Sequence, residues 1–159
     1  MRVVDLNANL ADDVRNLMSL GAPYVKCRTP SDYWLYAKLF SSTCPIAVVG
    51  DDTVVGAVIA MQGQVDRSEI YVQDVMVHPD RRRRGVAAAL ISAVREQAQR
   101  WGCRRIYLTS EPDNAPALHA WRSLGFINLV GDCVVNGVEV TKDFKGPGKD
   151  RAVFEMILR

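Results

Sequence analysis

Four consecutive arginines stand immediately before a segment with the pattern of a helix. The run is Arg81 to Arg84, and it is followed by Gly85 and then by Val86 to Leu90. Each cation at a helix N-terminus opposes the helix dipole and typically costs a few tenths to about 1 kcal/mol. Free backbone N–H groups at a helix start bind anions, and glycine lets a ligand approach closely. The run therefore predicts a site for a polyvalent anion such as a pyrophosphate, with a solvated basic turn as the alternative.

Two carboxylates are candidates for a general base. Asp74 lies inside the apolar segment 69–77, and Glu111 follows the apolar segment 104–110. A carboxylate can accept a proton directly or through one water, although each of these two could instead pair with an arginine or order a turn. If 69–77 is a regular strand, alternation divides its side chains between two faces, with Val72, Asp74 and Met76 on one and Gln73, Val75 and Val77 on the other.

Metal and disulfide chemistry are not expected. The cysteines are Cys27, Cys44, Cys103 and Cys133, which are far apart and form no C-x-x-C motif, and the chain has only two histidines. This pattern indicates reduced, mostly buried thiols rather than a zinc site or a disulfide framework. The glycine patterns of Walker and dinucleotide-binding loops are also missing.

Composition describes one globular domain over residues 1–159. The chain is 48% hydrophobic and 24% charged, which suits a single core. No apolar run approaches the roughly 20 residues of a membrane span, and the first residues lack the uninterrupted apolar segment of a signal peptide. We therefore expect a cytoplasmic protein with no membrane partner.

Positive charge is concentrated at one place. The net charge is +2, and four of the 20 basic residues lie in the arginine run, which leaves 16 against 18 acidic residues. Proteins that bind nucleic acids usually carry positive charge along a whole face. The acidic remainder therefore argues against a nucleic-acid partner and favours a local anion.

Periodicity predicts seven strands and four helices. The strands are expected at 2–6, 46–50, 53–63, 69–77, 104–110, 127–135 and 152–158. The helices are expected at 9–20, 31–40, 85–101 and 114–125. The strand, helix and strand over 69–110 form one right-handed parallel crossover, and the other connections are mainly antiparallel. The fold class is α/β (α+β), a mixed central sheet flanked by helices.

Two motifs lie in this framework at a specific separation. The first reads Val77, Pro79, Arg82, Gly85 and Ala87, and matches V-x-P-x-x-[QR]-x-x-G-x-[GA] between strand and helix. The second matches N-x-x-A-x-x-x-Y-x-x-x-G-F, with tryptophan in place of the tyrosine, and consists of Asn114, Ala117, Trp121, Gly125 and Phe126. Together they resemble the GNAT superfamily of acyl-CoA-dependent N-acyltransferases, and the resemblance covers the order of elements from about 2 to 158.

The resemblance implies a GNAT fold and acetyl-CoA as the cosubstrate. It implies that two strands are splayed apart to admit the thioester. The diphosphate would be held by Arg82, Arg83, Arg84, Gly85, Val86, Ala87 and Ala88. The pantetheine arm would be held by the main chain of Val75, Met76 and Val77, with Asn114 beyond it. In much of the family the tyrosine protonates the leaving thiolate, so Trp121 leaves the general acid open.

The acceptor is expected to be a primary amine on a small metabolite or amino-acid-like compound. Asp32, Tyr33 and Tyr36 are candidate acceptor-binding residues, and segment 27–49 is similar to part of the diaminobutyrate acetyltransferases, which indicates substrate size only. Residues 145–151 have the composition of a plain turn, but if functional their cations would attract an acceptor carboxylate. Thr109 stands where relatives that acetylate protein N-termini carry glutamate, which disfavours that subgroup.

Several alternatives remain open at this level. The acceptor could be an amine-bearing antibiotic or a protein lysine. A non-catalytic acyl-CoA-binding module is also compatible with Trp121 and with the uncertain base. The sequence does not determine the oligomeric state, and a homodimer is compatible with it.

Overall fold

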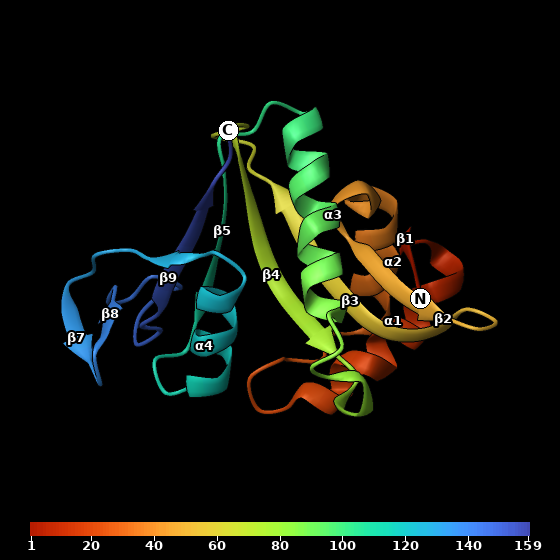
Figure 1. The fold of residues 1–159 in the computed structure, drawn as a ribbon, viewed down its shortest axis with the longest axis horizontal. Coiled ribbons are helices and arrows are strands. Elements are labelled where there is room, and N and C mark those ends of the chain that lie inside the picture. Colours follow the sequence, from red (N-terminus) through yellow and green to blue (C-terminus); the bar gives the residue numbers. More distant parts are fainter.

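A computed structural model describes residues 1–159 in full. The four helices are α1 (Ala11–Met18), α2 (Pro30–Leu39), α3 (Val86–Arg100) and α4 (Ala115–Ser123). The strands are β1 (Arg2–Asp5), β2 (Pro45–Val49), β3 (Thr53–Gln62), β4 (Glu69–Val77), β5 (Arg105–Ser110), β6 (Ile127–Asn128), β7 (Cys133–Val135), β8 (Val138–Val140) and β9 (Ala152–Ile157). Figure 1 shows their arrangement.

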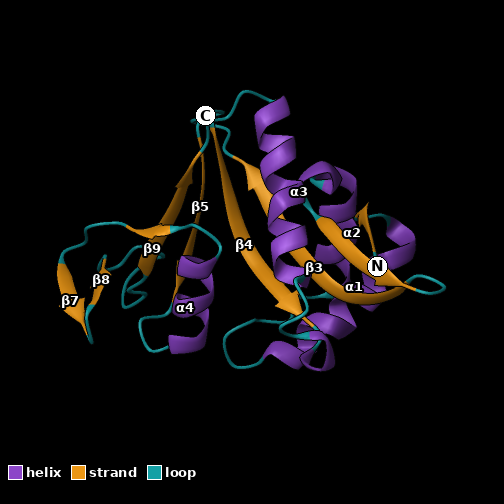
Figure 2. Ribbon diagram, viewed as in Figure 1, coloured by secondary structure: helices purple, strands orange, loops and turns teal.

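Seven strands form one mixed sheet in the order β1-β2-β3-β4-β5-β9-β6. Only β4 and β5 pair in parallel, and α3 connects them. All other neighbours are antiparallel. The predicted seven-stranded mixed sheet with four flanking helices is therefore confirmed (Figure 2).

The helices cover both faces of the sheet and enclose two apolar cores. On one face α3 and α4 pack on the sheet, with Leu90 and Phe154 fully buried there. On the other face α1 and α2 enclose a core that includes Tyr33 and Ile46. Gly56 lets α3 approach β3 closely, because a Cβ at this position would lie 2.6 Å from the Cγ1 of Val86. None of these helices has the length and apolar character needed to span a lipid bilayer.

Strands β4 and β5 pair at one end and separate at the other (Figure 1). Their parallel pairing runs from Glu69 opposite Arg105 to Val72 opposite Leu108, and it stops there. At the paired end the Arg105 guanidinium lies 2.9 Å from a carboxylate oxygen of Glu69 and 2.9 Å from one of Glu155, which joins three strands. The main chain of β4 beyond Val72 has no strand partner on the β5 side.

A β-bulge at Gln73 changes which face the later side chains of β4 occupy. Ile59 pairs with Asp74 and Ala60 pairs with Val72, so Gln73 is the extra residue. Val72 packs in the α3 core, whereas Met76 packs in the α1–α2 core. The predicted alternation, with Val72 on the face of Asp74, is therefore wrong, because a bulge shifts the pleat by one residue.

The predicted single strand 127–135 is also wrong. Its two ends form β6 and β7, and β7 pairs with the unpredicted β8 in a separate two-stranded hairpin. Asn136 and Gly137 both have positive φ (49° and 77°) and make the turn between β7 and β8. Asn-Gly between two β-branched segments is a strong signal for such a hairpin, so the hairpin could have been predicted from the sequence.

Candidate active site

The start of α3 exposes backbone donors to solvent. Gly85 is its N-cap with φ of 77°, and no side chain caps the helix. The N–H of Ala89 bonds to the Gly85 carbonyl, so the three preceding N–H groups have no partner within the helix. A Cβ on Gly85 would meet nothing within 4 Å, which leaves the approach to these N–H groups open.

The arginines beside this helix start are free cations. Arg82, Arg83 and Arg84 are exposed and take part in none of the ion pairs of the structure. Arg83 has φ of 61°, a conformation that non-glycine residues rarely adopt. Strained backbone of this kind concentrates at functional sites. Uncapped N–H groups and unpaired guanidinium groups together form a cradle suited to a polyvalent anion.

A cavity of about 520 Å³ opens where β4 and β5 separate. Four segments line it: 23–28 before α2, the bulged part of β4, the end of β5 with α4, and the loop before β9. The residues are Pro23, Tyr24, Val25, Lys26, Arg28, Gln73, Asp74, Val75, Thr109, Ser110, Glu111, Asn114, Ala117, Trp121, Lys145, Lys149 and Arg151. Both candidate bases, Asp74 and Glu111, line the same cavity.

Asp74 is a buried carboxylate with an unsatisfied oxygen. Its side chain is 8% exposed, and Oδ2 has no hydrogen-bond partner. The Nη2 of Arg28 lies 3.3 Å from Oδ2, close enough for an ion pair but outside hydrogen-bond geometry. Burial raises the pKa of Asp74, and the positive charges of Arg28 and Lys145 oppose that rise. The carboxylate is therefore a stronger base than an exposed aspartate.

Arg28 is held beside Asp74 by the bulge residue. With its amide oxygen turned toward Arg28, Gln73 accepts hydrogen bonds from Nε (3.0 Å) and Nη2 (3.1 Å). The hydroxyl of Tyr36 lies 3.4 Å from the same amide group. The bulge thus directs Gln73 and Asp74 toward one cation, which regular alternation would not do.

Glu111 has a more open environment than Asp74. Its side chain is 42% exposed, and its Oε1 lies 3.8 Å from Nη2 of Arg151. Nearby, the indole N–H of Trp121 donates to the Ser110 hydroxyl at 2.7 Å. That N–H is therefore occupied, and the Ser110 O–H remains free to donate into the cavity.

The comparisons with known proteins agree with this geometry. The sequence model of the Acetyltransferase (GNAT) family matches residues 11–126. The chain belongs to the GNAT acetyltransferase family. No curated protein is significantly similar to the chain in sequence.

Solved structures share the GNAT fold over nearly the whole chain. Diaminobutyrate acetyltransferase EctA from Paenibacillus lautus, in complex with L-2,4-diaminobutyric acid and coenzyme A, has a TM-score of 0.76 at 22% identity and covers 98% of this chain and 94% of that chain. Ard1 from Thermoplasma volcanium has a TM-score of 0.81 at 14% identity, with 99% and 97% covered. The yncA protein from Salmonella typhimurium, with acetyl-CoA, has a TM-score of 0.72 at 16% identity, with 100% and 94% covered.

The residues that the GNAT resemblance assigns to the thioester lie along one path. Val75, Met76 and Val77 occupy the open part of β4, and Arg82 to Ala88 surround the start of α3. Asn114 caps α4 by accepting from the Ala117 N–H at 3.3 Å, and it also lines the cavity. These positions run from the helix start to the cavity.

None of the three predicted acceptor residues lines the cavity. Asp32 closes a capping box with Thr29 at the start of α2. Tyr33 is fully buried, and its hydroxyl accepts from the Arg28 N–H at 3.2 Å. Tyr36 lies nearer, behind Gln73. These side chains were predicted to bind the acceptor only because they lie on or near the second helix. In the structure Asp32 instead caps α2, and Tyr33 packs in the core.

Sequence reasoning missed several residues that line the cavity, among them Lys26, Arg28 and Ser110. The first two lie in an irregular segment before α2, where no periodicity or motif marks them. Ser110 ends a strand that was correctly predicted, and its position next to Glu111 was the available signal.

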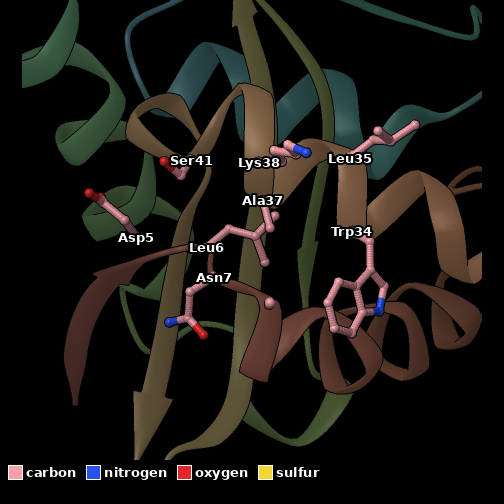
Figure 3. A pocket seen from close by; sticks show the side chains of 9 residues that line it. Asp5, Leu6, Asn7, Trp34, Leu35, Ala37, Lys38 and Ser41 are labelled. Atoms are coloured by element: carbon pink, nitrogen blue, oxygen red, sulfur yellow. The ribbon is translucent and has the colours of Figure 1, made fainter.

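A larger cavity, of about 710 Å³, lies elsewhere in the molecule (Figure 3). It is formed between α2 and the segment that follows β1, with Leu6, Trp34 and Leu35 among its lining residues. Its charged side chains, Asp5 and Lys38, are exposed. Because it contains no buried titratable group, we place the chemistry in the smaller cavity.

Proposed function

We propose that the protein transfers the acetyl group of acetyl-CoA to the primary amine of a small, amino-acid-like acceptor. The observation that carries this proposal is the buried, unsatisfied Asp74 carboxylate at the point where β4 and β5 separate. Membership of the GNAT family supports the acyl-transfer chemistry. The EctA structure supports the size of the acceptor, because its ligand is a small diamino acid.

The chain offers a fitting site for the thioester. Arg82, Arg83 and Arg84, with the uncapped N–H groups of α3, would hold the diphosphate. The main chain of Val75 to Val77, which pairs with β3 but has no strand partner on the β5 side, would hold the pantetheine arm. Gly85 has φ of 77°, a left-handed conformation that glycine adopts without strain and other residues rarely adopt, so glycine suits this turn. When bound, acetyl-CoA supplies an acetyl group activated as a thioester.

Asp74 would remove the proton that blocks the amine. A free alkylammonium has a pKa of about 10.4, so the acceptor arrives protonated at neutral pH. The carboxylate attracts this ammonium group, and its raised pKa makes it a better proton acceptor. Main-chain N–H groups of β4 that face the gap would donate to the thioester carbonyl oxygen as negative charge develops there.

With Trp121 in place of tyrosine, the leaving coenzyme A thiolate has no acid at this position to protonate it. Its N–H is bonded to Ser110 and is not an acid that can donate a proton. A coenzyme A thiol has a pKa near the 8.5 of cysteine, so it can leave as a thiolate stabilised by nearby dipoles. The Ser110 hydroxyl, which accepts a hydrogen bond from the indole N–H and lines the cavity, is a side-chain donor that would supply such a hydrogen bond.

A thiol-release assay tests the proposal. Acetyl-CoA is incubated with the protein and a panel of primary amines that includes amino acids, diamines, aminoglycosides and a lysine peptide. We expect acceptor-dependent release of coenzyme A with small amino-acid-like amines. If calorimetry shows that acetyl-CoA binds but no amine stimulates release, the protein is an acyl-CoA-binding module.

A further inference from the structure

We propose that the acceptor carries an excess of negative charge: besides its amine it bears two oxyanionic charges, as in an amino dicarboxylate or a phosphorylated amine. This inference rests on the proposed function and specifies its substrate class. It comes from the charges around the cavity, from the structure of one loop, and from the position of Asp74.

The cavity holds more cations than carboxylates. Its lining includes five cations and two carboxylates, which leaves three positive charges in excess; the cations are Lys26, Arg28, Lys145, Lys149 and Arg151. Each of the two carboxylates already forms an ion pair with an arginine: Arg28 lies 3.3 Å from Asp74, and Arg151 lies 3.8 Å from Glu111. The three lysines take part in no ion pair. The excess charge is therefore available to a ligand.

The loop that carries two of these lysines is held in a defined shape by its own aspartates. Asp143 accepts from the Gly148 N–H at 2.8 Å, and Asp150 accepts from the Asp143 N–H at 2.9 Å. A main-chain bond from the Lys145 N–H to the Lys149 carbonyl (3.2 Å) closes the turn. The acidic side chains are used inside the loop, while Lys145 and Lys149 line the cavity.

The loop is also anchored to its surroundings. Thr141 and Arg151 pair across its base in both directions, at 2.8 and 3.0 Å. The main-chain positions of the two lysines are therefore set by the fold before a ligand arrives, which reduces the entropy lost when a ligand binds to the loop. A plain strand connection requires the glycines and the proline, but it does not require two unpaired lysines facing a cavity.

Asp74 and the lysines are complementary ends of one site. The carboxylate is more than nine-tenths buried, and its Oδ2 lacks a donor. An ammonium group satisfies that oxygen, whereas an oxyanion satisfies the lysines. A ligand with one amine and two oxyanionic charges meets both requirements. A diamino acid such as L-2,4-diaminobutyric acid, with two ammonium groups and one carboxylate, has a net charge of +1 and would add to the excess positive charge of the cavity.

Acceptor pairs that differ by one oxyanionic group, a carboxylate in one pair and a phosphate in the other, test the inference. L-Glutamate is compared with L-glutamine, and phosphoethanolamine with ethanolamine, in the thiol-release assay at saturating acetyl-CoA. We expect the more anionic member of a pair to have a kcat/KM at least about tenfold higher. The pair with the larger ratio identifies carboxylate or phosphate as the source of the charge.

Variants locate the effect on the loop. Lys145→Gln and Lys149→Gln should each raise the KM for the anionic acceptor about fivefold, the size expected for one exposed charge contact. The kcat should be unchanged when it is measured above the acid limb of the pH profile, because Lys145 also lowers the pKa of Asp74. Lys142→Gln is the matched control, because Lys142 is exposed on the same loop and does not line the cavity. If these variants instead raise the KM for acetyl-CoA, the lysines serve that ligand and the inference is overturned.

A binding measurement separates this inference from the proposed function. Glutarate and inorganic phosphate are titrated by calorimetry into protein saturated with coenzyme A, so that phosphate does not compete for the diphosphate site. We expect binding that weakens in the Lys145→Gln, Lys149→Gln double variant but not in Lys142→Gln. Lysine-dependent binding without any turnover would refute the acetyl transfer and keep the oxyanion site. Equal kcat/KM within both pairs, or anion binding that the double variant leaves intact, would refute the oxyanion site.

Discussion

Replacing Asp74 by asparagine should abolish most activity and at the same time stabilise the protein. The substitution keeps the shape of the side chain but removes its charge and its ability to accept a proton. The two effects have separate causes in the structure, because one concerns the amine and the other concerns the cost of a buried charge. Their opposite signs make the test sharp.

The loss of activity follows from general-base catalysis. A positioned base typically contributes about 10²- to 10⁴-fold to the rate, and each factor of ten corresponds to about 1.4 kcal/mol. We therefore expect kcat/KM for the amine to fall by at least about a hundredfold. The KM for acetyl-CoA should remain unchanged, since the α3 cradle is untouched.

The gain in stability follows from the raised pKa. In the unfolded chain Asp74 titrates near 3.8, and in the folded protein burial moves its pKa upward. Because the folded state binds the proton more tightly, the protonated Asp74 carboxyl favours folding, and this favourable contribution is fully present below pH 3.8. It is lost as the pH rises through the folded-state pKa. At neutral pH the ionised carboxylate thus destabilises the fold.

The size of this gain can be bounded from the unsatisfied oxygen. An orphaned buried polar group costs about 1–3 kcal/mol, which for a domain of this size corresponds to a Tm increase of roughly 2–12 °C. Thermal unfolding of Asp74→Asn at pH 7, with Glu111→Gln as the exposed-carboxylate control, measures it. If Asp74→Asn lowers both turnover and Tm, the carboxylate is a structural partner of Arg28, and our assignment of the base is refuted.

Three further substitutions probe the surroundings of the site. Arg28→Gln removes a charge that lowers the pKa of Asp74, so the acid limb of the plot of kcat/KM against pH should move to higher pH. Because the substitution also leaves the buried carboxylate without its cation, the free energy of unfolding should fall by about 2 kcal/mol. An acid limb that does not move would show that Asp74 is not the titrating base. Gly56→Val places a Cβ 2.6 Å from the Cγ1 of Val86, and chemical denaturation should show a loss of about 1–3 kcal/mol. Arg84→Ala should raise the KM for acetyl-CoA about fivefold and weaken its salt dependence, without lowering the Tm, because it removes a cation from a helix start. A lower Tm with unchanged KM would assign Arg84 a structural role instead.

The parts of the protein that sequence reasoning predicted correctly are those encoded in consecutive residues. The helix α3, its glycine N-cap and the arginines before it lie within one stretch of chain. The crossover from β4 through α3 to β5 follows from three adjacent periodic segments. Local propensity and handedness are sufficient for such features.

The acceptor side of the site could not be predicted from consecutive residues. It is assembled from four segments, and Lys26 is more than a hundred residues from Lys149 along the chain. The bulge at Gln73 was invisible to a period-2 pattern, although it decides that Gln73 and Asp74 meet the same arginine. A single inserted residue reverses every later side chain of a strand, so an error of one position was enough to misplace half of β4.

Charge that is unfavourable in the free protein is the feature common to all three parts of the site. The arginines at the start of α3 oppose its dipole, the Asp74 oxygen lacks a donor, and the cavity lysines lack counterions. The first two destabilise the free protein, and the clustered lysines repel one another. A diphosphate, an ammonium group and an oxyanion would each reverse the sign of one of them. The start of α3, the Asp74 carboxylate and the cavity lysines follow one another from α3 into the cavity. We therefore expect the charges of the two bound substrates to follow the same order: first the diphosphate, then the ammonium group, then the oxyanion.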